Sequence, residues 1–580
     1  MHIVLTASAE TGISSPLMEG ALTSLAVAFS FAWPKLGVVW FARVEHLFAR
    51  LAHRRRWSVA AVGLSALLLR LAILPWHPAP LPFVPDDFSF LLAANTFALG
   101  RLSNPTPAMW IHFESIHIDM LPTYGSMYFP GQGLLLAAGK VLLGHPWYGV
   151  LLAGALMCAA ICWMLQAWLP PTWALLGGFI AVIRIALFSY WTNTYHSAGA
   201  LTALGGALVF GALPRLTRAP RRRYALVMAA GFAILALTRP FECMLLSIPV
   251  AIELGRWLLF AKNRPKFAEF FRCTAPALVL LLAAAAWMGY YNDRVFGSPL
   301  TLPYSVNRAT YAIAPYFNWQ SPRPEPAYHH EEMRRFYHDK ELVIFNKIHS
   351  LPGFVSQTLL KPVQAIMFFA GLAFLPMLLF LPRALADHRI RFLILCLAVL
   401  AAGMSIEAFM FSYYLAPFTA AIYAVGLQAM RHLRHWRPSK QYVGRTMMRL
   451  AITVAILMAA LRPFDRVLHF PSVAWSGDWY GPDRIGTTRA DVEQQLEQLP
   501  GRQLVIVRYS QQHSPLDEWV YNDPDIDRSK IIWARDMNSA SNKELLDYYK
   551  DRTVWLVQPD IDPVSLSGYA ARRYDVLVHP

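Results

Sequence analysis

The sequence predicts an α-helical polytopic membrane protein with about 11–12 transmembrane helices, followed by a small C-terminal α/β domain. Three observations support this fold class. Of the 580 residues, 56% are hydrophobic and only 15% are charged, whereas soluble domains are near a quarter charged. Long apolar runs alternate with short basic clusters along most of the chain. After Asp465 the composition changes, because acidic residues become frequent and apolar runs become short.

The charge pattern points to a membrane and not to nucleic acid. The formal net charge is +16, which alone would suit a nucleic-acid-binding protein. The basic residues, however, fall in short clusters between apolar runs, as the positive-inside rule describes. The 19 Trp and 24 Tyr suit aromatic belts at the two interfaces. We therefore expect membrane lipid as a partner and no nucleic acid.

The N-terminal segment 1–56 leaves three alternatives open. Leu17–Val44 suits an extra span, an interfacial helix or a signal-like start, although no small-residue cleavage site follows it. The basic cluster His53–Arg56 then marks the cytoplasmic side. The run Trp57–Leu74 leads outward, so Asp86 and Asp87 emerge on the external side.

Ten further apolar runs can be ordered between the basic clusters. Gln132–Leu143, about a dozen residues long, is too short to cross and is predicted to be an amphipathic surface helix. With that helix left out, a transmembrane domain over 57–463 has its outer loops 75–147 and 292–362 on the same side as the domain 464–580. The ten runs are Tyr148–Trp168, Trp173–Phe188, His196–Leu213, Tyr224–Leu237, Cys243–Phe260, Ala275–Tyr291, Ile366–Leu381, Phe392–Phe411, Leu415–Met430 and Ala451–Leu461.

The C-terminal domain is predicted to be a small parallel sheet. Gln503–Tyr509, Ile531–Ala534 and Thr553–Val557 have the composition of buried strands. Leu516–Asn522 and Asn542–Tyr549 are predicted as the intervening helices, the second opened by Ser541 and Asn542. Ser510, His513 and Asp517 follow the first strand as a hydrolytic triad would, but no nucleophile elbow accompanies them. We favour a docking or acceptor-positioning module.

The first outer loop, Pro85–Gly133, is the stretch in which we expect the chemistry. Two adjacent carboxylates, Asp86 and Asp87, follow a membrane exit directly. Such charges are costly to desolvate, which favours a wet cavity facing a substrate. A solvated loop start without a role is the alternative. In an extended loop, adjacent side chains point to opposite sides, so only one of the two would face a substrate.

This loop resembles that of a known enzyme superfamily. The pattern Asp86-Asp87-Phe88-Ser89-Phe90, the expected helix Leu91–Leu99, Gly100-Arg101, and the aromatic-Pro segment leading into a surface helix are similar to the first outer loop of GT-C glycosyltransferases. The nearest groups are bacterial relatives of the protein O-mannosyltransferases, including the aminoarabinose lipid A transferase. The resemblance covers about Trp57 to Leu461 and leaves out the C-terminal domain.

The resemblance implies transfer of a sugar from a polyprenyl-phosphate donor to an acceptor hydroxyl, usually with inversion. The acceptor would be an envelope glycan, a lipid or a protein, on the periplasmic side of a bacterial inner membrane. No cofactor is required, and a divalent metal is possible but not predicted. The loop aspartate would act as general base, because an attacking hydroxyl must lose its proton to a carboxylate within reach. By the family pattern Asp86 is the first choice and Asp87 the second.

The departing lipid phosphate needs cations. Arg101, Arg239 and Arg308 are the candidates at the outer face; an ion pair of Arg239 with Glu242, snorkelling of Arg239, and simple solvation of Arg308 are alternatives. The family often has Lys-x-Pro-Pro before the surface helix, but this chain has Met127-Tyr128-Phe129-Pro130. Either another cation substitutes, or donor handling differs, or activity is lost.

Further polar residues near the outer face fall into two groups, those that we assign to the substrate site and those that we do not. His112, Glu114, His117 and Asp119 alternate at spacings that suit a metal, but equally suit the polar face of an extended segment, so no metal site is predicted. His329–Glu332 with His338 is predicted to be an exposed charged helix, and Arg184 and Glu407 are intramembrane charges without an assigned role. The other predicted substrate-binding residues are Glu114, Tyr128, Gln132, Tyr195, His196, Glu242 and Tyr414.

Two other function classes compete with a transferase. A transporter or flippase for a lipid-linked glycan predicts charges near the bilayer midplane and repeated halves, and no internal repeat is evident. A catalytically inactive GT-C-like scaffold, acting through its outer domain, is consistent with Met127 in place of the family's lysine.

Overall fold

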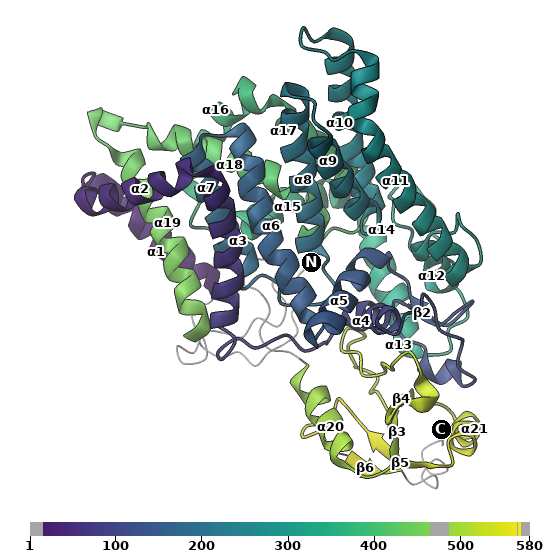
Figure 1. Cartoon of the computed structure of the whole chain (residues 1–580). Coiled ribbons are helices and arrows are strands. Elements are labelled where there is room, and N and C mark those ends of the chain that lie inside the picture. Colours follow the sequence, from purple (N-terminus) through teal and green to yellow (C-terminus); the bar gives the residue numbers. More distant parts are fainter. Residues whose placement is uncertain (1–14, 465–485, 565, 570–580) are drawn as a thin grey trace. The chain divides into compact units, whose positions relative to one another are not determined.

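The computed structural model describes residues 15–464, 486–564 and 566–569, and it is mostly helical (Figure 1). The chain divides into two compact units, each assembled from three separate segments. Unit 1 comprises Met1–Ala79, Trp147–Ala286 and Ser350–Asp483, and unit 2 comprises Pro80–Pro146, Trp287–His349 and Arg484–Pro580. The first outer loop, part of the second outer loop and the C-terminal domain of the sequence analysis therefore form one compact unit.

Unit 1 is a bundle of helices in which α6 packs against α3, α7 and α8, and α8 also packs against α9. Its α-helices are α1 (Ser15–Ala32), α2 (Val38–His53), α3 (Arg55–Ala72), α6 (Trp147–Trp168), α7 (Pro171–Ala181), α8 (Gly199–Arg218), α9 (Arg222–Ala236), α10 (Pro240–Phe260), α11 (Phe267–Phe296, which continues into unit 2), α15 (Leu351–Phe369), α16 (Leu381–Leu385), α17 (Arg391–Ile406), α18 (Thr419–Arg434) and α19 (Val443–Leu461). Short π- or 3-10-helical turns are η2 (Val182–Ala186), η4 (Leu375–Phe380), η5 (His388–Ile390), η6 (Ser412–Phe418), η7 (Pro438–Lys440) and η8 (Arg462–Phe464).

Among the described residues, 7 helices are long and apolar enough to cross a membrane. They are Ser15–Ala32, Trp147–Trp168, Gly199–Arg218, Pro240–Phe260, Phe267–Phe296, His388–Ile406 and Val443–Phe464. The predicted span Ile366–Leu381 is wrong as a continuous helix. Helix α15 ends at Phe369, and the turn that follows contains Gly371 at φ +64°, where an added Cβ would meet the Arg184 guanidinium. A left-handed residue of this kind interrupts the helical backbone.

The segment Leu17–Val44 forms two helices, α1 and α2, rather than one. Helix α1 packs along α19, and it is held by a buried ion pair. The Glu19 carboxylate of α1 accepts a hydrogen bond from Arg184 Nη1 at 2.8 Å and another from the Leu372 backbone N–H at 3.1 Å. Arg184 lies in η2, is fully buried, and also donates to the Met367 carbonyl. This pair gives Arg184 a structural role.

Unit 2 combines short helices with two sheets. Its helical elements are α4 (Pro85–Ala98), η1 (Trp110–Phe113), α5 (Pro130–Leu143), α12 (Pro303–Tyr311), α13 (Glu331–Arg334), η3 (Arg335–Leu342, a π-helix), α14 (Val343–His349), α20 (Thr487–Gln498), η9 (Ile526–Arg528) and α21 (Ser539–Tyr548). A small hairpin pairs β1 (Ile118–Asp119) with β2 (Gly125–Ser126). The larger sheet has the order β4-β3-β5-β6, with β3 (Arg502–Val507), β4 (Ile531–Arg535), β5 (Arg552–Val557) and β6 (Leu566–Gly568). The predicted surface helix Gln132–Leu143 corresponds to α5.

The larger sheet confirms the three predicted strands, because β3 pairs in parallel with both β4 and β5. Helix α21 confirms the second predicted helix, although its N-cap is Asn538, whose side chain accepts from the Ser541 N–H. The predicted helix Leu516–Asn522 is wrong: this stretch is irregular. Its Asn522 side chain hydrogen-bonds the backbone of Trp533 in β4 in both directions, at 2.8 Å each, which substitutes for helical hydrogen bonds. Helix α20 and the antiparallel strand β6 were not predicted.

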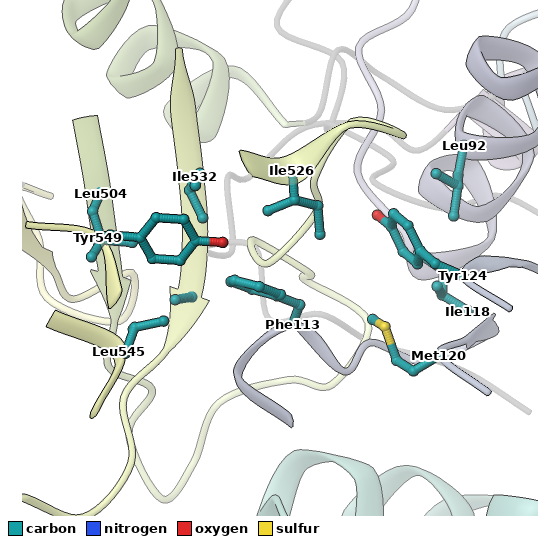
Figure 2. Close-up of a cluster of buried hydrophobic side chains, with 11 residues drawn as sticks. Leu92, Phe113, Ile118, Met120, Tyr124, Leu504, Ile526, Ile532, Leu545 and Tyr549 are labelled. Atoms are coloured by element: carbon teal, nitrogen blue, oxygen red, sulfur yellow. The ribbon is translucent and has the colours of Figure 1, made fainter. Parts of the chain in front are cut away.

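The first outer loop and the C-terminal domain share a hydrophobic core, as Figure 2 shows. The outer loop contributes one set of buried side chains and the C-terminal domain another, so neither segment buries its apolar face alone. Burial of such side chains contributes about 1.5–3 kcal/mol each. The members from the loop are Leu92, Phe113, Ile118, Met120 and Tyr124, and those from the C-terminal domain are Leu504, Ile526, Ile532, Ala534, Leu545 and Tyr549.

A buried cation reinforces this shared core. Arg535, at the end of β4, donates from Nε to the Glu114 carbonyl at 2.7 Å and from Nη2 to Glu518 at 2.7 Å. Glu518 also accepts hydrogen bonds from Ser115 at 3.0 Å and Tyr509 at 2.9 Å. Both members of the ion pair are only 2% exposed, so the carboxylate compensates the desolvated guanidinium.

Removal of one partner from the buried Glu19–Arg184 pair is expected to destabilise unit 1 strongly. Arg184→Met leaves a buried carboxylate uncompensated and should lower the free energy of unfolding by about 3–5 kcal/mol. Adding Glu19→Leu should recover much of the loss, because the unpaired charge is then gone. Thermal unfolding of the detergent-solubilised chain measures both variants. Arg502→Met is the control, since Arg502 and Asp551 are both more than half exposed and such a pair contributes about 0–1 kcal/mol. Equal losses for the two arginines would contradict the structural role of Arg184.

Candidate functional site

Asp86 and Asp87 lie in the first turn of α4, and not in the extended loop that the sequence analysis assumed. Pro85 occupies the first helical position and Val84 is an extended N-cap, an arrangement that starts helices because proline lacks an N–H and has a helical φ. Acidic residues in a first turn are also favoured by the helix dipole. Asp87 is buried and accepts the Phe83 backbone N–H at 3.3 Å. The Asp86 side chain remains 22% exposed.

Asp86 is held by two polar side chains of the same outer loop. The Tyr128 hydroxyl donates to Asp86 Oδ1 in a short hydrogen bond. His117 Nδ1 lies 3.4 Å from Asp86 Oδ2 and 3.1 Å from the Tyr128 oxygen. The Tyr128 ring in turn stacks on Phe90 of α4, with ring centroids 4.3 Å apart. The three polar side chains form one connected cluster with a partly exposed carboxylate, which we call the Asp86 cluster.

The local backbone fixes His117 in the Asp86 cluster. His117 has φ +66°, which is uncommon for a residue with a side chain. Its carbonyl accepts hydrogen bonds from the Ser89 hydroxyl at 2.6 Å and from the Met127 N–H at 3.3 Å. Ser89 belongs to α4, so the helix that carries Asp86 also anchors the turn that presents His117. The ring packs edge-on against Phe336, at 5.1 Å between centroids.

Lys340 supplies a cation to the Asp86 cluster. It lies in the π-helix η3, and π-helical turns occur often at functional sites. Burial lowers the pKa of Lys340 to about 8, while the negative charges of Asp86 and Glu341 act in the opposite direction. The ammonium is thus within electrostatic reach of Asp86. Sequence analysis missed Lys340, because it is a single lysine in a charged segment more than two hundred residues away along the chain.

Two of the three predicted phosphate-binding arginines are engaged within unit 2. Arg101 forms a two-pronged ion pair with Asp525, at 3.0 and 2.7 Å. Arg308 is buried rather than solvated, and its Nη1 contacts both carboxylate oxygens of Glu341, at 2.9 and 2.7 Å. The charge of Glu341 holds the pKa of Arg308 above its usual value despite burial, which lowers it. Both guanidinium groups therefore have a carboxylate partner already.

The third arginine, Arg239, belongs to a separate aromatic cluster in unit 1. Its guanidinium carbon lies 4.6 Å from the ring centroid of Tyr413 and 4.3 Å from that of Tyr414. Its Nη1 is 3.5 Å from Glu242 Oε1, so the local ion pair considered in the sequence analysis is present. His196 joins this group through its contact with the Tyr413 ring.

The remaining predicted residues fall into these two units. Tyr195, His196, Arg239, Glu242 and Tyr414 lie in unit 1, while Asp86, Asp87, Arg101, Glu114, Tyr128, Gln132 and Arg308 lie in unit 2. Lys361 of α15 was not predicted; its ammonium donates to the carbonyls of Met404 and Glu407 in unit 1, at 2.5 and 2.9 Å.

The run His112–Asp119 sends its four polar side chains to different partners. His112 binds the carbonyls of Arg535 and Ser541, at 3.2 Å each. Glu114 accepts from Tyr311 at 2.8 Å and contacts His329 Nδ1 at 2.7 Å. Within the described ranges, no three His, Cys, Asp or Glu side chains come together as a metal site would require.

The second outer loop is less exposed than its charge suggested. His330 is buried, and its Nε2 lies 2.6 Å from the Ile111 carbonyl. Burial lowers the pKa of His330 to about 3, so this histidine is neutral. The predicted exposure of the stretch His329–Glu332 is therefore wrong for His330, which packs onto the first outer loop, whereas His329 is exposed as predicted.

The residues Ser510, His513 and Asp517 do not form a hydrolytic triad. His513 Nδ1 contacts Asp560 at 2.8 Å, and its Nε2 contacts the Asp517 carbonyl, not the carboxylate, at 2.8 Å. Both ring nitrogens are thus engaged away from the Ser510 hydroxyl, which accepts the Gln512 N–H at 3.2 Å. Without a base beside the serine, the arrangement has no activated nucleophile.

Comparisons with known proteins give structural similarity only. No family model matches the sequence, and neither does any curated protein. Solved structures of the Archaeoglobus fulgidus oligosaccharyltransferase are similar, with TM-scores of 0.41, 0.41 and 0.39 and identities of 12%, 11% and 12%. The matched regions cover 85%, 87% and 86% of this chain and 68%, 69% and 67% of the three solved chains. One is tethered with an acceptor peptide, one is in complex with an inhibitory peptide and a dolichol-phosphate, and one with Zn and sulfate.

Asp119 is a buried carboxyl group beside the site. It accepts a hydrogen bond from Asn307 Nδ2 at 3.0 Å, while its Oδ2 has no hydrogen-bond partner in the described part of the chain. Burial raises the pKa of Asp119 to about 7, against a smaller opposite effect of the Asn307 hydrogen bond. The folded state therefore keeps a proton that the unfolded state loses near pH 4.

This raised pKa predicts a pH-dependent stability. As the pH rises from about 4 through 7, the wild-type protein loses stability on the order of 4 kcal/mol from Asp119, and the loss is complete above the folded pKa. Asp119→Asn keeps the Asn307 contact and removes the titration. The difference in free energy of unfolding between the variant and the wild type should therefore favour the variant more at about pH 8 than at about pH 5. Thermal unfolding at both pH values tests this, with exposed Asp293→Asn as control. A pH-independent difference would show that Asp119 does not titrate in this range.

Proposed function

We propose that the chain is an integral-membrane glycosyltransferase that moves a sugar from a polyprenyl-phosphate donor to an acceptor hydroxyl. The observation that carries this proposal is the Asp86 cluster: a partly exposed carboxylate held by Tyr128 and His117, with the Lys340 cation in electrostatic reach. A base and a cation in one site suit a reaction that removes a proton and releases an anion. The apolar helices of unit 1 suit a lipid-linked donor.

Asp86 is the general base in this proposal. Its carboxylate takes the proton of the acceptor hydroxyl as the oxygen bonds to the anomeric carbon, and the bond from that carbon to the phosphate oxygen breaks. The electron pair leaves with the phosphate. Attack and departure on opposite faces of the sugar give inversion. Tyr128 and His117 hold the carboxylate in place between turnovers, and acceptor binding would displace one of their contacts.

Lys340 is the cation that receives the leaving phosphate. It takes over the role of the lysine that the family has at the position of Met127. A charge-assisted contact of this kind contributes about 1.5–3 kcal/mol. Arg239, whose guanidinium lies over the rings of Tyr413 and Tyr414 in unit 1, stays a phosphate-binding candidate from the sequence analysis. In this proposal, neither the proton removal by Asp86 nor the departure of the phosphate requires a metal or an organic cofactor.

The setting follows from the predicted topology. Unit 2 faces the periplasm of a bacterial inner membrane, and the acceptor is an envelope glycan, a lipid or a protein. The C-terminal domain then acts as a docking module, because it shares a core with the loop that carries Asp86.

Asp86→Asn should reduce kcat for sugar transfer by about 10²–10⁴-fold, because an amide cannot accept the proton. Transfer from a panel of polyprenyl-phosphate pentoses and hexoses, measured in membranes that contain the variant, tests this. Exposed Asp293→Asn is the matched control and should retain activity. Loss in Asp87→Asn but not in Asp86→Asn would move the base to Asp87. Undiminished transfer in both variants rules out the loop base, and flipping of the lipid without transfer would favour a flippase.

The pKa of Lys340 predicts the alkaline limb of the rate profile. Protonated Lys340 neutralises the leaving phosphate, so the transfer rate should fall as the pH rises through about 8. Lys340→Arg keeps a cation at all accessible pH values, because guanidinium does not deprotonate there. The alkaline limb should therefore shift upward in this variant, and Lys340→Met should be slow at every pH. A limb that stays near pH 8 in Lys340→Arg would assign it to another group.

A further inference from the structure

A second pocket lies in unit 1, away from the residues of the proposed reaction. It is a cavity of about 510 Å³ between the C-terminal part of α8, the later turns of α10, and the start of α17. Its walls combine three arginines, Arg256, Arg389 and Arg391, with the aromatic rings of Trp168 and Phe392. The mechanism proposed above uses none of these residues.

The charge of this pocket is positive. Glu253 is the acidic residue on its wall, and it is neutralised by Arg256 through contacts of 2.9 and 2.7 Å. Arg389 and Arg391 are exposed and form no ion pair within the described part of the chain. Nearby Asp387 accepts the Arg389 backbone N–H at 2.9 Å and a hydrogen bond from Gln428. His388, also on the wall, is exposed. The guanidinium groups of Arg389 and Arg391 thus give the pocket its positive charge.

The backbone at this wall is already capped. Helix α17 continues directly from the 3-10 turn η5, and the Asp387 side chain caps that start by accepting the Arg389 backbone N–H. The preference of the pocket for an anion therefore comes from its arginine side chains. A phosphate is the matching group, since guanidinium binds phosphate oxygens bidentately.

The other wall is apolar. Trp168 and Phe392 stack with centroids 6.0 Å apart and an interplanar angle of 7°, and Leu213 and Leu395 complete the surface. Aromatic rings beside basic residues are typical of the level at which lipid headgroups lie. The basic clusters near this pocket, Arg215–Arg223 and Arg383–Arg391, are those that the sequence predicts on the cytoplasmic side.

We propose that this pocket binds the phosphate of an anionic phospholipid headgroup on the cytoplasmic side of the membrane. Arg389 and Arg391 contact the phosphate oxygens, and the Trp168–Phe392 wall packs against the apolar part of the lipid. The site is a lipid-binding site separate from the Asp86 cluster, and it does not depend on the proposed transferase activity. A free phosphate shares the same recognition chemistry, so the experiment distinguishes the two sources.

The test uses the full chain in neutral detergent. Its thermal stability is measured with increasing short-chain phosphatidylglycerol, with short-chain phosphatidylcholine and with inorganic phosphate. A ligand that binds the folded state raises the unfolding temperature, and the rise grows with the logarithm of the ligand concentration divided by its Kd. We expect phosphatidylglycerol to stabilise more than phosphatidylcholine. The double variant Arg389→Gln, Arg391→Gln should raise the apparent Kd for phosphatidylglycerol about 30-fold. This figure follows from the usual contribution of two basic residues near an anionic lipid.

Two further variants make the result specific. Arg54→Gln with Arg56→Gln removes the same charge from exposed residues outside the pocket and should retain the effect. Glu253→Gln removes the acidic wall and should strengthen binding, which keeps the proposal testable if the double arginine variant unfolds. Equal stabilisation by inorganic phosphate, lost in the same variant, would support the phosphate site but assign it a soluble source. Equal effects of both phospholipids, or equal losses in both double variants, would overturn the proposal.

Discussion

The hydrophobic core shared by the first outer loop and the C-terminal domain is the constraint on which the candidate site depends. Helix α4 carries Asp86 at its first turn and Leu92 in this core. The same helix presents Phe88, whose ring stacks on Tyr521 at 4.8 Å. Because α4 is fixed through contacts with a domain about four hundred residues later in the sequence, the position of Asp86 is set by tertiary packing. A loop without this support would not hold a carboxylate in one place.

Buried charges provide the second set of restraints. Arg535 with Glu518 and Arg308 with Glu341 lie in unit 2, and Arg184 with Glu19 lies in unit 1. Each pair joins segments that are distant in sequence or that differ in secondary structure. Burying a charge is costly unless a partner compensates it, so each pair specifies one arrangement of its segments. The two cations of unit 2 differ in this respect: Arg308 is paired with the Glu341 carboxylate, whereas burial lowers the pKa of Lys340 to about 8.

The two polar regions differ in the way they are built. In the Asp86 cluster, Tyr128 and His117 come from one loop and contact a carboxylate that is still 22% exposed. In unit 1, the Arg239 guanidinium lies over the faces of two tyrosine rings and beside the Glu242 carboxylate. The basic pocket at the start of α17 adds a third region, in which arginine side chains lie beside the stacked rings of Trp168 and Phe392.

The sequence by itself determined the features that depend on local pattern. Composition and apolar runs predicted a mostly helical chain with apolar helices, and alternation of apolar runs predicted the strands β3, β4 and β5 and the helix α21. It also singled out Asp86, because adjacent carboxylates beside an apolar run are unusual on energetic grounds. These features arise from periodicity, hydropathy and the cost of burying charge, all of which can be read within a window of about twenty residues.

Tertiary structure alone decided which distant residues meet. It paired Arg308 with Glu341 and Arg101 with Asp525, it brought Lys340 to Asp86, and it replaced the predicted helix Leu516–Asn522 with an irregular segment bonded to β4. It also broke the predicted span Ile366–Leu381 at Gly371, where the Arg184 guanidinium occupies the space that a side chain would need. Such partners are chosen by burial and charge compensation across hundreds of residues, and no local pattern records them.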